Sequence, residues 1–480
     1  MKKKIKSILL NYNNLSIVVK ASLWFMIVTV IDKSVAIITQ PIINRILSVD
    51  EVGVFGVYNS WRSIFAVLAT FNLYGGVLEV LLTKESDKKR EFVSSLCSLS
   101  IVISLVFWSV FFVFESFLNN FLELKNEYIL VMACAIISDA IIQFWAVPKR
   151  FEYSYKLYSF VLGGLFVTKS VLSVILTFLF SEDRILGRIL GLAIPSLVVA
   201  IVLLFFIMRN CKLTKLTKYW KKGFLFNLPL IPHYLSTILL ASSDRIMIQY
   251  FEDDTSVGLY TIAYSYANLI LIFFNAINNS YNPLSMQCIK NKDYEKLSYT
   301  TNLMLVFSVI FSILMMLFAP EGIWLLGGDN YIPAVKIIPI LIIGIFFSSF
   351  YFVFSNIEFV YEKNKYIFPV TLVGAILNIG LNFLLIPIWG YEIAALTTLL
   401  GYIVIAILHY FISLRIIGKD VYKIKKILFN VLLLILGGGV AYISYGFNII
   451  IRYIIVLALM VVIIIALKKY GYILSLFKKD

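Results

Sequence analysis

The chain alternates between long apolar runs and short polar segments along its whole length. About fourteen apolar runs can be traced, at residues 19–47, 53–82, 92–117, 127–148, 157–181, 185–208, 224–250, 257–286, 299–325, 334–360, 366–389, 392–414, 426–447 and 449–467. Each is close to the ~20 residues that a helix needs to cross a bilayer. Backbone amides cannot be left unpaired in hydrocarbon, and the runs are longer than the alternating strands of a membrane barrel. The pattern therefore predicts an all-α integral membrane protein with about fourteen transmembrane helices.

Composition supports a lipid-embedded fold, because 61% of the 480 residues are hydrophobic and only 14% are charged. The net charge of +15 raises the possibility of a nucleic-acid partner. However, the lysines and arginines fall in short clusters between apolar runs, where the positive-inside rule expects them, so we expect no nucleic acid. The 4 cysteines lack CxxC spacing and there are only 2 histidines, which argues against a disulfide framework or a zinc site. We find no nucleotide-binding or hydrolase motif and expect a transporter rather than an enzyme.

Alternate connecting segments carry opposite charge. Basic clusters lie at 84–90, 149–156, 209–222, 290–296 and 415–426, whereas acidic residues lie at 50–51, 182–183 and 252–254. By the positive-inside rule this alternation places both termini in the cytoplasm. The basic start, Lys2 to Lys4 and Lys6, is interpreted as an uncleaved cytoplasmic end.

An internal repeat relates the two halves of the chain. The segment "ILSVDEVGVFGVYNSW" at 46–61 resembles "YFEDDTSVGLYTIAYS" at 250–265, and Gly53 then matches Gly258. This offset covers an even number of predicted helices, so both copies should have the same topology. We expect a six-helix N-lobe at 1–208, a cytoplasmic linker at 209–222, a six-helix C-lobe at 223–415, and a helix pair with a cytoplasmic tail at 416–480.

We single out seven charged residues within predicted spans, where each costs a few kcal/mol or more. They are the cations Lys33, Arg62, Lys169 and Arg245 and the acids Asp32, Asp139 and Asp244. Such groups persist only beside a watery cavity or a partner. The surplus of cations favours a cavity for an anionic substrate such as a phosphate-bearing headgroup. Structural pairing is the alternative, although neighbours such as Asp32 and Lys33 point about 100° apart and would each need a partner on another helix.

Other polar residues in the spans leave two interpretations open. Amides on later spans either bind a sugar chain or bridge helices. They are Asn275, Asn278, Asn279, Asn356, Asn378 and Asn382. Glu79 and Glu358 lie near the cytoplasmic ends of their spans, so we expect them at the interface, with ion coupling as the alternative.

Two segments resemble a known family. They are "KASLWFMIVTVIDKSVAIITQPIINRILSVDEVGVFGVY" and "FLFNLPLIPHYLSTILLASSDRIMIQYFEDDTSVGLYTIAYSYA". Both look like bacterial polysaccharide flippases of the Wzx type, from the superfamily that includes multidrug and toxic compound extruders and the lipid II flippase. The pattern is carried by Pro229, Pro232, Ser243, Asp244, Arg245, Gly258, Leu259 and Tyr260.

The resemblance implies a V-shaped bundle of two six-helix lobes plus a C-terminal helix pair. Such a protein moves an undecaprenyl-diphosphate-linked oligosaccharide across the bacterial cytoplasmic membrane, for polysaccharides such as O antigen or capsule. The diphosphate would meet Lys33, Arg62, Lys169 and Arg245. No cofactor is implied, and a proton or sodium gradient is one possible energy source, with Asp32, Asp139 and Asp244 as charge partners or ion-coupling groups.

Membrane lipids, a polysaccharide polymerase and a chain-length regulator are the further partners that this resemblance implies. Two alternatives stay open. A cation-coupled drug or metabolite antiporter of the same superfamily would favour acidic cavity residues. A membrane-embedded polymerase or ligase would usually carry a large outer loop, and every predicted outer loop here is short.

Overall fold

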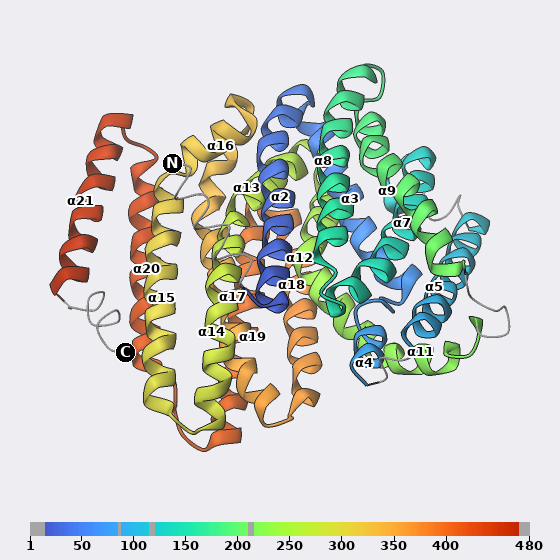
Figure 1. Ribbon diagram of the computed structural model, residues 1–480. Coiled ribbons are helices and arrows are strands. Elements are labelled where there is room, and N and C mark those ends of the chain that lie inside the picture. The colour runs from blue at the N-terminus through green and yellow to red at the C-terminus, as the bar shows by residue number, and fades with distance from the viewer. Residues whose placement is uncertain (1–14, 85–87, 115–120, 210–215, 470–480) are drawn as a thin grey trace, which may run out of the picture. The chain divides into compact units, whose positions relative to one another are not determined.

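The computed structural model describes residues 15–84, 88–114, 121–209 and 216–469, and every regular element in these ranges is a helix (Figure 1). Thirteen helical stretches of the described chain are long and apolar enough to cross a membrane. The last expected span, 449–467, corresponds to α21 (Ile449–Lys469), of which the part counted as apolar is Ile449–Ala458. The protein is thus an all-α, multi-pass membrane protein, which confirms the prediction from its apolar runs.

The chain divides into two compact units, Met1–Ile238 and Leu239–Asp480. The helices that begin in the first unit are α2 (Ile17–Ile46), α3 (Val49–Thr70), α4 (Val77–Lys84), α5 (Lys89–Val113), α7 (Asn126–Phe151), α8 (Tyr155–Leu179), α9 (Arg184–Met208), α11 (Trp220–Asn227), η2 (Leu228–Leu230) and α12 (Ile231–Phe251). Since α12 contains the division between the units, the lobe boundaries expected around 209–222 stay a prediction.

The second unit continues with eleven further helices in the described chain. They are α13 (Asp254–Ala267), α14 (Leu269–Lys290), α15 (Tyr294–Leu317), α16 (Ala319–Gly327), η3 (Asp329–Ile337), α17 (Ile338–Val360), η4 (Asn364–Tyr366), α18 (Ile367–Trp389), α19 (Glu392–Ile417), α20 (Ile424–Ser444) and α21.

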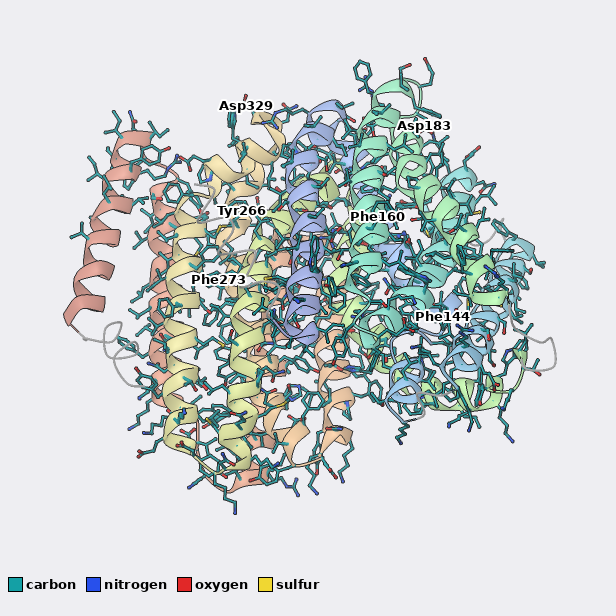
Figure 2. The ribbon with its side chains drawn as sticks, in the orientation of Figure 1. Phe144, Phe160, Asp183, Tyr266, Phe273 and Asp329 are labelled. Atoms are coloured by element: carbon teal, nitrogen blue, oxygen red, sulfur yellow. The ribbon has the colours of Figure 1, made fainter. Side chains whose placement is uncertain are left out.

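Short polar side chains fix where several helices begin. The Ser48 hydroxyl accepts from the Glu51 backbone N–H, and the Glu51 carboxylate accepts from the Ser48 N–H at 2.8 Å, which forms a capping box before α3. Asp253 caps α13, and Asp183 (Figure 2) caps α9 through the Leu186 N–H at 2.9 Å. Helix α3 begins at Val49 and α13 at Asp254, which is the offset of the sequence repeat.

The second predicted span, 53–82, is not one continuous helix. It is interrupted between α3 and α4, where Phe71 and Asn72 have φ of 54° and 47°. The buried Asn227 of α11 satisfies the backbone at this break. Its amide donates to the carbonyl oxygens of Phe71 (2.8 Å) and Asn72 (3.0 Å), and its Oδ1 accepts from the Val77 N–H (3.0 Å). A side chain 150 residues away in sequence therefore stabilises the interruption.

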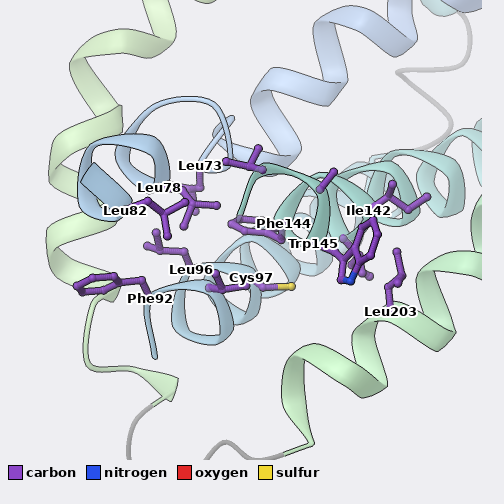
Figure 3. Close-up of a cluster of buried hydrophobic side chains, with 14 of the residues drawn as sticks. Leu73, Leu78, Leu82, Phe92, Leu96, Cys97, Ile142, Phe144, Trp145 and Leu203 are labelled. Atoms are coloured by element: carbon purple, nitrogen blue, oxygen red, sulfur yellow. The ribbon is translucent and has the colours of Figure 1, made fainter. Parts of the chain in front are cut away.

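The core of the first unit forms beside this break. Figure 3 shows side chains of α4, α5 and α7 gathered in one cluster, with Leu78, Phe92, Leu96 and Phe144 all fully buried. Phe92 also packs edge-on against Tyr219, just before α11, with the ring centroids 4.5 Å apart. The polar links at the break thus lie beside an apolar core that excludes water from them.

In the second unit, α17 is the central helix and packs against α13, α14, α15, α19 and α20. Its fully buried rings Phe350 and Phe354 stack with centroids 5.4 Å apart. Helices α15, α20 and α21 lie side by side (Figure 1). Arg452 of α21 pairs with Glu321 of α16, and the Tyr445 hydroxyl donates to the Met316 carbonyl at 2.6 Å. The last two helices are therefore docked on this unit by polar contacts as well as packing.

Replacing Asn227 with alanine should lower the free energy of unfolding by about 2 kcal/mol or more, because several buried backbone groups lose their partner at once. Unfolding in mixed SDS micelles would measure the change. Asn364→Ala, which alters an exposed asparagine, serves as the control. An Asn227→Ala protein as stable as the control would show that the break does not depend on this side chain.

Candidate functional site

Three of the predicted charged residues come together in the first unit. Lys169 of α8 lies with its Nζ 3.0 Å from Asp139 Oδ1, and Arg62 of α3 pairs with Asp139 Oδ2. The Ser196 hydroxyl of α9 also donates to Asp139 Oδ1, at 3.0 Å. We call Arg62, Asp139 and Lys169 the cation cluster. These three residues lie on three helices, and Ser196 of a fourth helix is a partner of Asp139 that the sequence did not reveal.

Close helix packing holds the cation cluster in place. A Cβ on Gly191 of α9 would lie 2.3 Å from Ser173 Cα of α8, so only glycine permits this approach. The crossing brings Lys169 on α8 and Ser196 on α9 to the same carboxylate of α7. The site is therefore built on rigid, closely packed helices rather than on loops.

The charges of the cluster do not cancel. Arg62 and Lys169 each carry a positive charge, and Asp139 is the one acid with which they pair in the described chain. The side chains are neither fully buried nor free, with exposed fractions of 34% for Arg62, 30% for Asp139 and 18% for Lys169. A surplus positive charge thus lies within reach of a ligand, in a span where bare charge is costly.

Asp32 and Lys33 form a separate pair on α2. Their charged atoms lie 3.3 Å apart, and the Lys33 side chain is 54% exposed. The expectation that each would need a partner on another helix is wrong for these two residues. Although the two side chains leave the helix in different directions, the long and flexible lysine side chain bends along the helix surface and reaches the carboxylate.

Asp244 of α12 is fully buried in the second unit and is held by uncharged donors. Its Oδ2 accepts from the hydroxyls of Tyr260 (2.6 Å) and Thr398 (2.7 Å), and its Oδ1 accepts from the amides of Asn382 (2.6 Å) and Asn378 (3.3 Å). These donors come from α13, α18 and α19. We call this group the Asp244 cluster.

Arg245 diverges from its neighbour. Its Nε donates to Thr261 Oγ1 at 3.2 Å, its Nη1 donates to the Ala241 carbonyl at 3.3 Å, and its guanidinium lies 4.5 Å from the Tyr264 ring centroid. A cation over an aromatic face gains electrostatic attraction without a counter-charge. Arg245 is thus a half-buried cation on an aromatic surface, and Asp244 is not part of an ion pair with it.

The chemistry of the two clusters differs. A surplus cation next to an accessible surface suits an anionic ligand. In the Asp244 cluster, by contrast, a buried carboxylate accepts from two amide N–H groups and two hydroxyl groups, so its hydrogen-bond donors are all uncharged. Within the described residues no group of three or more histidine, cysteine or acidic side chains is placed to hold a metal ion.

Glu358, which lies two residues before the end of α17, is buried inside the protein, and its expected place at the membrane interface stays a prediction. Glu358 of α17 and His409 of α19 are both 0% exposed, and His409 Nδ1 lies 2.5 Å from Glu358 Oε1. His409 is one of only 2 histidines in the chain, and its place within an apolar span was the sequence signal for this buried pair. A histidine within an apolar span is a reason to look for a buried acid. Glu79, in contrast, is exposed at the end of its span and pairs with Arg150 at 3.5 Å.

Arg188 of α9 is a further buried cation that the sequence analysis did not identify. Its guanidinium lies 3.5 Å from the Phe55 ring centroid, and its Nη2 donates to Gln40 Oε1 at 3.3 Å. It lies only a few residues inside its predicted span, 185–208. Positive charges are common near the ends of membrane spans, so its position did not indicate burial. Its burial could be found only from the packing of α2, α3 and α9.

Family models match most of the chain. A model described as "Polysaccharide biosynthesis protein" matches residues 18–288. A second model, MatE, matches residues 229–384. The first model covers more than half of the chain. It includes Arg62, Asp139, Lys169 and Asp244, the charged residues of the two clusters.

Curated relatives and solved structures agree with these models. The chain is 24% identical over 372 residues to an Lsg locus protein of Haemophilus influenzae, covering 76% of this chain and 90% of the relative. It is 23% identical over 381 residues to Agl15 of Haloferax volcanii, described as a probable low-salt glycan biosynthesis flippase, covering 76% and 77%. The fold is similar to that of the lipid II flippase MurJ in an inward closed conformation, with a TM-score of 0.67, 15% identity, and 93% and 99% of the chains covered.

If Asp139 neutralises part of the cation cluster, Asp139→Ala should lower the free energy of unfolding by about 1–3 kcal/mol, because two cations lose their shared partner. The double variant Asp139→Ala with Lys169→Met should recover part of that loss, since one of the two cations is then gone. Unfolding in mixed SDS micelles measures both. Strictly additive losses in the double variant would contradict the coupling.

Proposed function

This chain belongs to the polysaccharide biosynthesis protein family, and from that premise we propose that it is a flippase for lipid-linked oligosaccharides. Its substrate would be an undecaprenyl-diphosphate-linked repeat unit, moved from the cytoplasmic to the outer leaflet of the bacterial cytoplasmic membrane. Both termini would lie in the cytoplasm, as the alternation of charged segments indicates. The description of Agl15 as a probable glycan biosynthesis flippase and the likeness to the fold of a lipid II flippase support this reading.

The cation cluster is the observation that carries the proposal. It holds two cations against a single carboxylate, and its side chains remain partly exposed. A diphosphate supplies the negative charge that this arrangement lacks and accepts several charge-assisted hydrogen bonds. A cationic drug would meet repulsion at the same position. The substrate's headgroup is therefore assigned to Arg62 and Lys169, with Asp139 holding both in place.

The other predicted cations have weaker claims. Lys33 is largely exposed and already paired with Asp32, and Arg245 is supported by Tyr264 and Thr261. Either residue can add to the positive field around the headgroup. However, neither is one of two cations that pair with a single acid, as Arg62 and Lys169 do with Asp139. A polymerase and a chain-length regulator remain expected partners of the flippase, on the resemblance alone.

The Asp244 cluster supports coupling to a cation gradient. Its carboxylate is fully buried, and the four side chains that donate to it are all uncharged. Binding a proton or Na⁺ there would neutralise that acid. Because a buried charge is costly, the bound ion would favour the conformation in which Asp244 is buried. The MatE match over residues 229–384 includes Asp244, and it keeps a cation-coupled antiporter as the second candidate function.

The flippase activity can be tested in liposomes that contain the protein and a fluorescent undecaprenyl-diphosphate oligosaccharide, by following protection of the label from an impermeant quencher. Arg62→Gln should slow translocation by at least about tenfold, because it makes the cluster neutral and removes a charge-assisted bond of ~1.5–3 kcal/mol. Arg62→Lys should retain much of the rate.

The control for this experiment is Lys363→Gln, which removes an exposed lysine outside the cluster. Equal rates for Arg62→Gln and the control would remove the headgroup assignment. No protein-dependent movement of the lipid in the wild type would return weight to the antiporter.

Coupling can be tested separately with Asp244→Asn, which keeps the side-chain shape but removes the charge. In the same liposomes, an imposed proton or sodium gradient should no longer accelerate translocation, while binding of the lipid is retained. Glu362→Gln, at an exposed acid, is the matched control. A variant that still responds to the gradient like the control would show that the coupling ion binds elsewhere.

A further inference from the structure

Helix α14 carries four asparagines on one face. Asn275, Asn278, Asn279 and Asn282 have the spacing i, i+3, i+4 and i+7, which places them along one stripe of a helix. Asn275 and Asn279 are exposed, and Asn278 and Asn282 are half-buried. We call this stripe the amide face.

The amides of this face have no partner in the described chain. No hydrogen bond joins any of the four side chains to another described residue, and the Oδ1 atoms of Asn278 and Asn282 are buried without a partner. The other asparagines of the later spans are occupied, since Asn356 donates to Ser285 at 2.7 Å and Asn378 and Asn382 bind Asp244. Helix bridging therefore explains those three and leaves the amide face unexplained.

The amide face lies within Asp254–Lys290, a helical stretch long and apolar enough to cross a membrane. Helices α14 and α15 run antiparallel, because Phe273 (Figure 2) stacks on Phe311 with centroids 4.1 Å apart and the Tyr281 hydroxyl lies 2.8 Å from Thr301 Oγ1. Asn278 lines a small cavity together with Met304 and Ser308. The asparagines are thus level with the apolar run of α15, which continues to Leu317.

An amide at this depth cannot face lipid without a large penalty. An unpaired amide costs several kcal/mol in hydrocarbon, and four are concentrated here. The exposed face of α5 shows what lipid selects, because it is aliphatic at Val102, Leu105, Val106 and Val110. The amide face has the opposite chemistry, so it borders water or a polar ligand.

We infer that the amide face binds the sugar hydroxyl groups of the translocated lipid, an inference that rests on the proposed function. An asparagine side chain offers two N–H donors and a carbonyl acceptor, which matches hydroxyls that both donate and accept. It carries no charge, so it does not compete with the cation cluster for the diphosphate. The exposed neighbours Ala276 and Ser280 are small and leave space beside the amides. The amide face would thus recognise the sugar rather than the charge of the lipid.

Binding of two lipids separates this inference from the proposed function. The probes are undecaprenyl diphosphate with its oligosaccharide and undecaprenyl diphosphate alone, titrated against the full-length protein in nanodiscs. Asn275→Ala/Asn279→Ala should weaken binding of the glycan-bearing lipid about tenfold and leave binding of the bare lipid unchanged. Arg62→Gln should weaken both. Asn291→Ala/Asn364→Ala, at exposed asparagines outside the stripe, is the matched control.

Each outcome decides one point. If the wild type binds neither lipid, the proposed function fails and the inference with it. If the wild type binds both and the Asn275→Ala/Asn279→Ala variant behaves like the control, the inference fails and the proposed function stands. An equal loss for both lipids also overturns it, because the amides would then not act on the sugar.

A labelling experiment tests the amide face without relying on affinity. Asn279→Cys in a background that lacks the native cysteines should react with a membrane-impermeant maleimide, and the glycan-bearing lipid should slow that reaction. Val106→Cys on the aliphatic face of α5 should stay unreactive. An unreactive Asn279→Cys would place the stripe in lipid and overturn the inference.

Discussion

Hydrocarbon offers no partner to a charge or to a free hydrogen-bonding group, and this constraint explains where most polar side chains of the protein lie. Asp139 joins two cations, Asp244 gathers four uncharged donors, and Glu358 pairs with His409, each within a set of packed helices. The same rule acts on the backbone, because the interruption after α3 persists only where Asn227 completes its hydrogen bonds. Packing around these groups then keeps water out, which strengthens every bond inside.

The two units solve the problem of buried charge in different ways. In the first, an acid is over-compensated by Arg62 and Lys169, which leaves positive charge for a ligand. In the second, the buried acid Asp244 accepts from uncharged donors, while its neighbour Arg245 turns to Thr261 and Tyr264. The two units therefore surround an acid with different chemistry, namely cations in the first and neutral donors in the second.

Much of the fold could be predicted because the apolar runs are long and the solvent requires helices. The exceptions have local physical causes. The break in the second span uses left-handed backbone at Phe71 and Asn72. Asn72 and the following Gly75 and Gly76 are turn-forming residues, but they stand inside a long apolar run. The stabilising partner, Asn227, is distant in sequence. Arg62, Asp139 and Lys169 could be identified as costly charges, but their common meeting point depends on helix packing at Gly191 that no single segment encodes. The burial of Glu358 against His409 could not be predicted from its place near a span end, because α17 packs against other helices along its length.

Residue type alone did not separate structural from ligand-binding amides either. Asn356, Asn378 and Asn382 face other helices, where each finds a specific acceptor, and their role is to complete polar clusters. The asparagines of α14 have the same chemistry, but their side chains form no hydrogen bond with another described residue, even at Asn278, which lines a small cavity with Met304 and Ser308. Since natural sequences rarely keep four unpaired amides at hydrocarbon depth without a use, the lack of partners is itself the signal. A lipid-linked oligosaccharide needs both an anion site and neutral hydroxyl recognition, and a chain that kept only the cation cluster would hold any lipid diphosphate with equal strength.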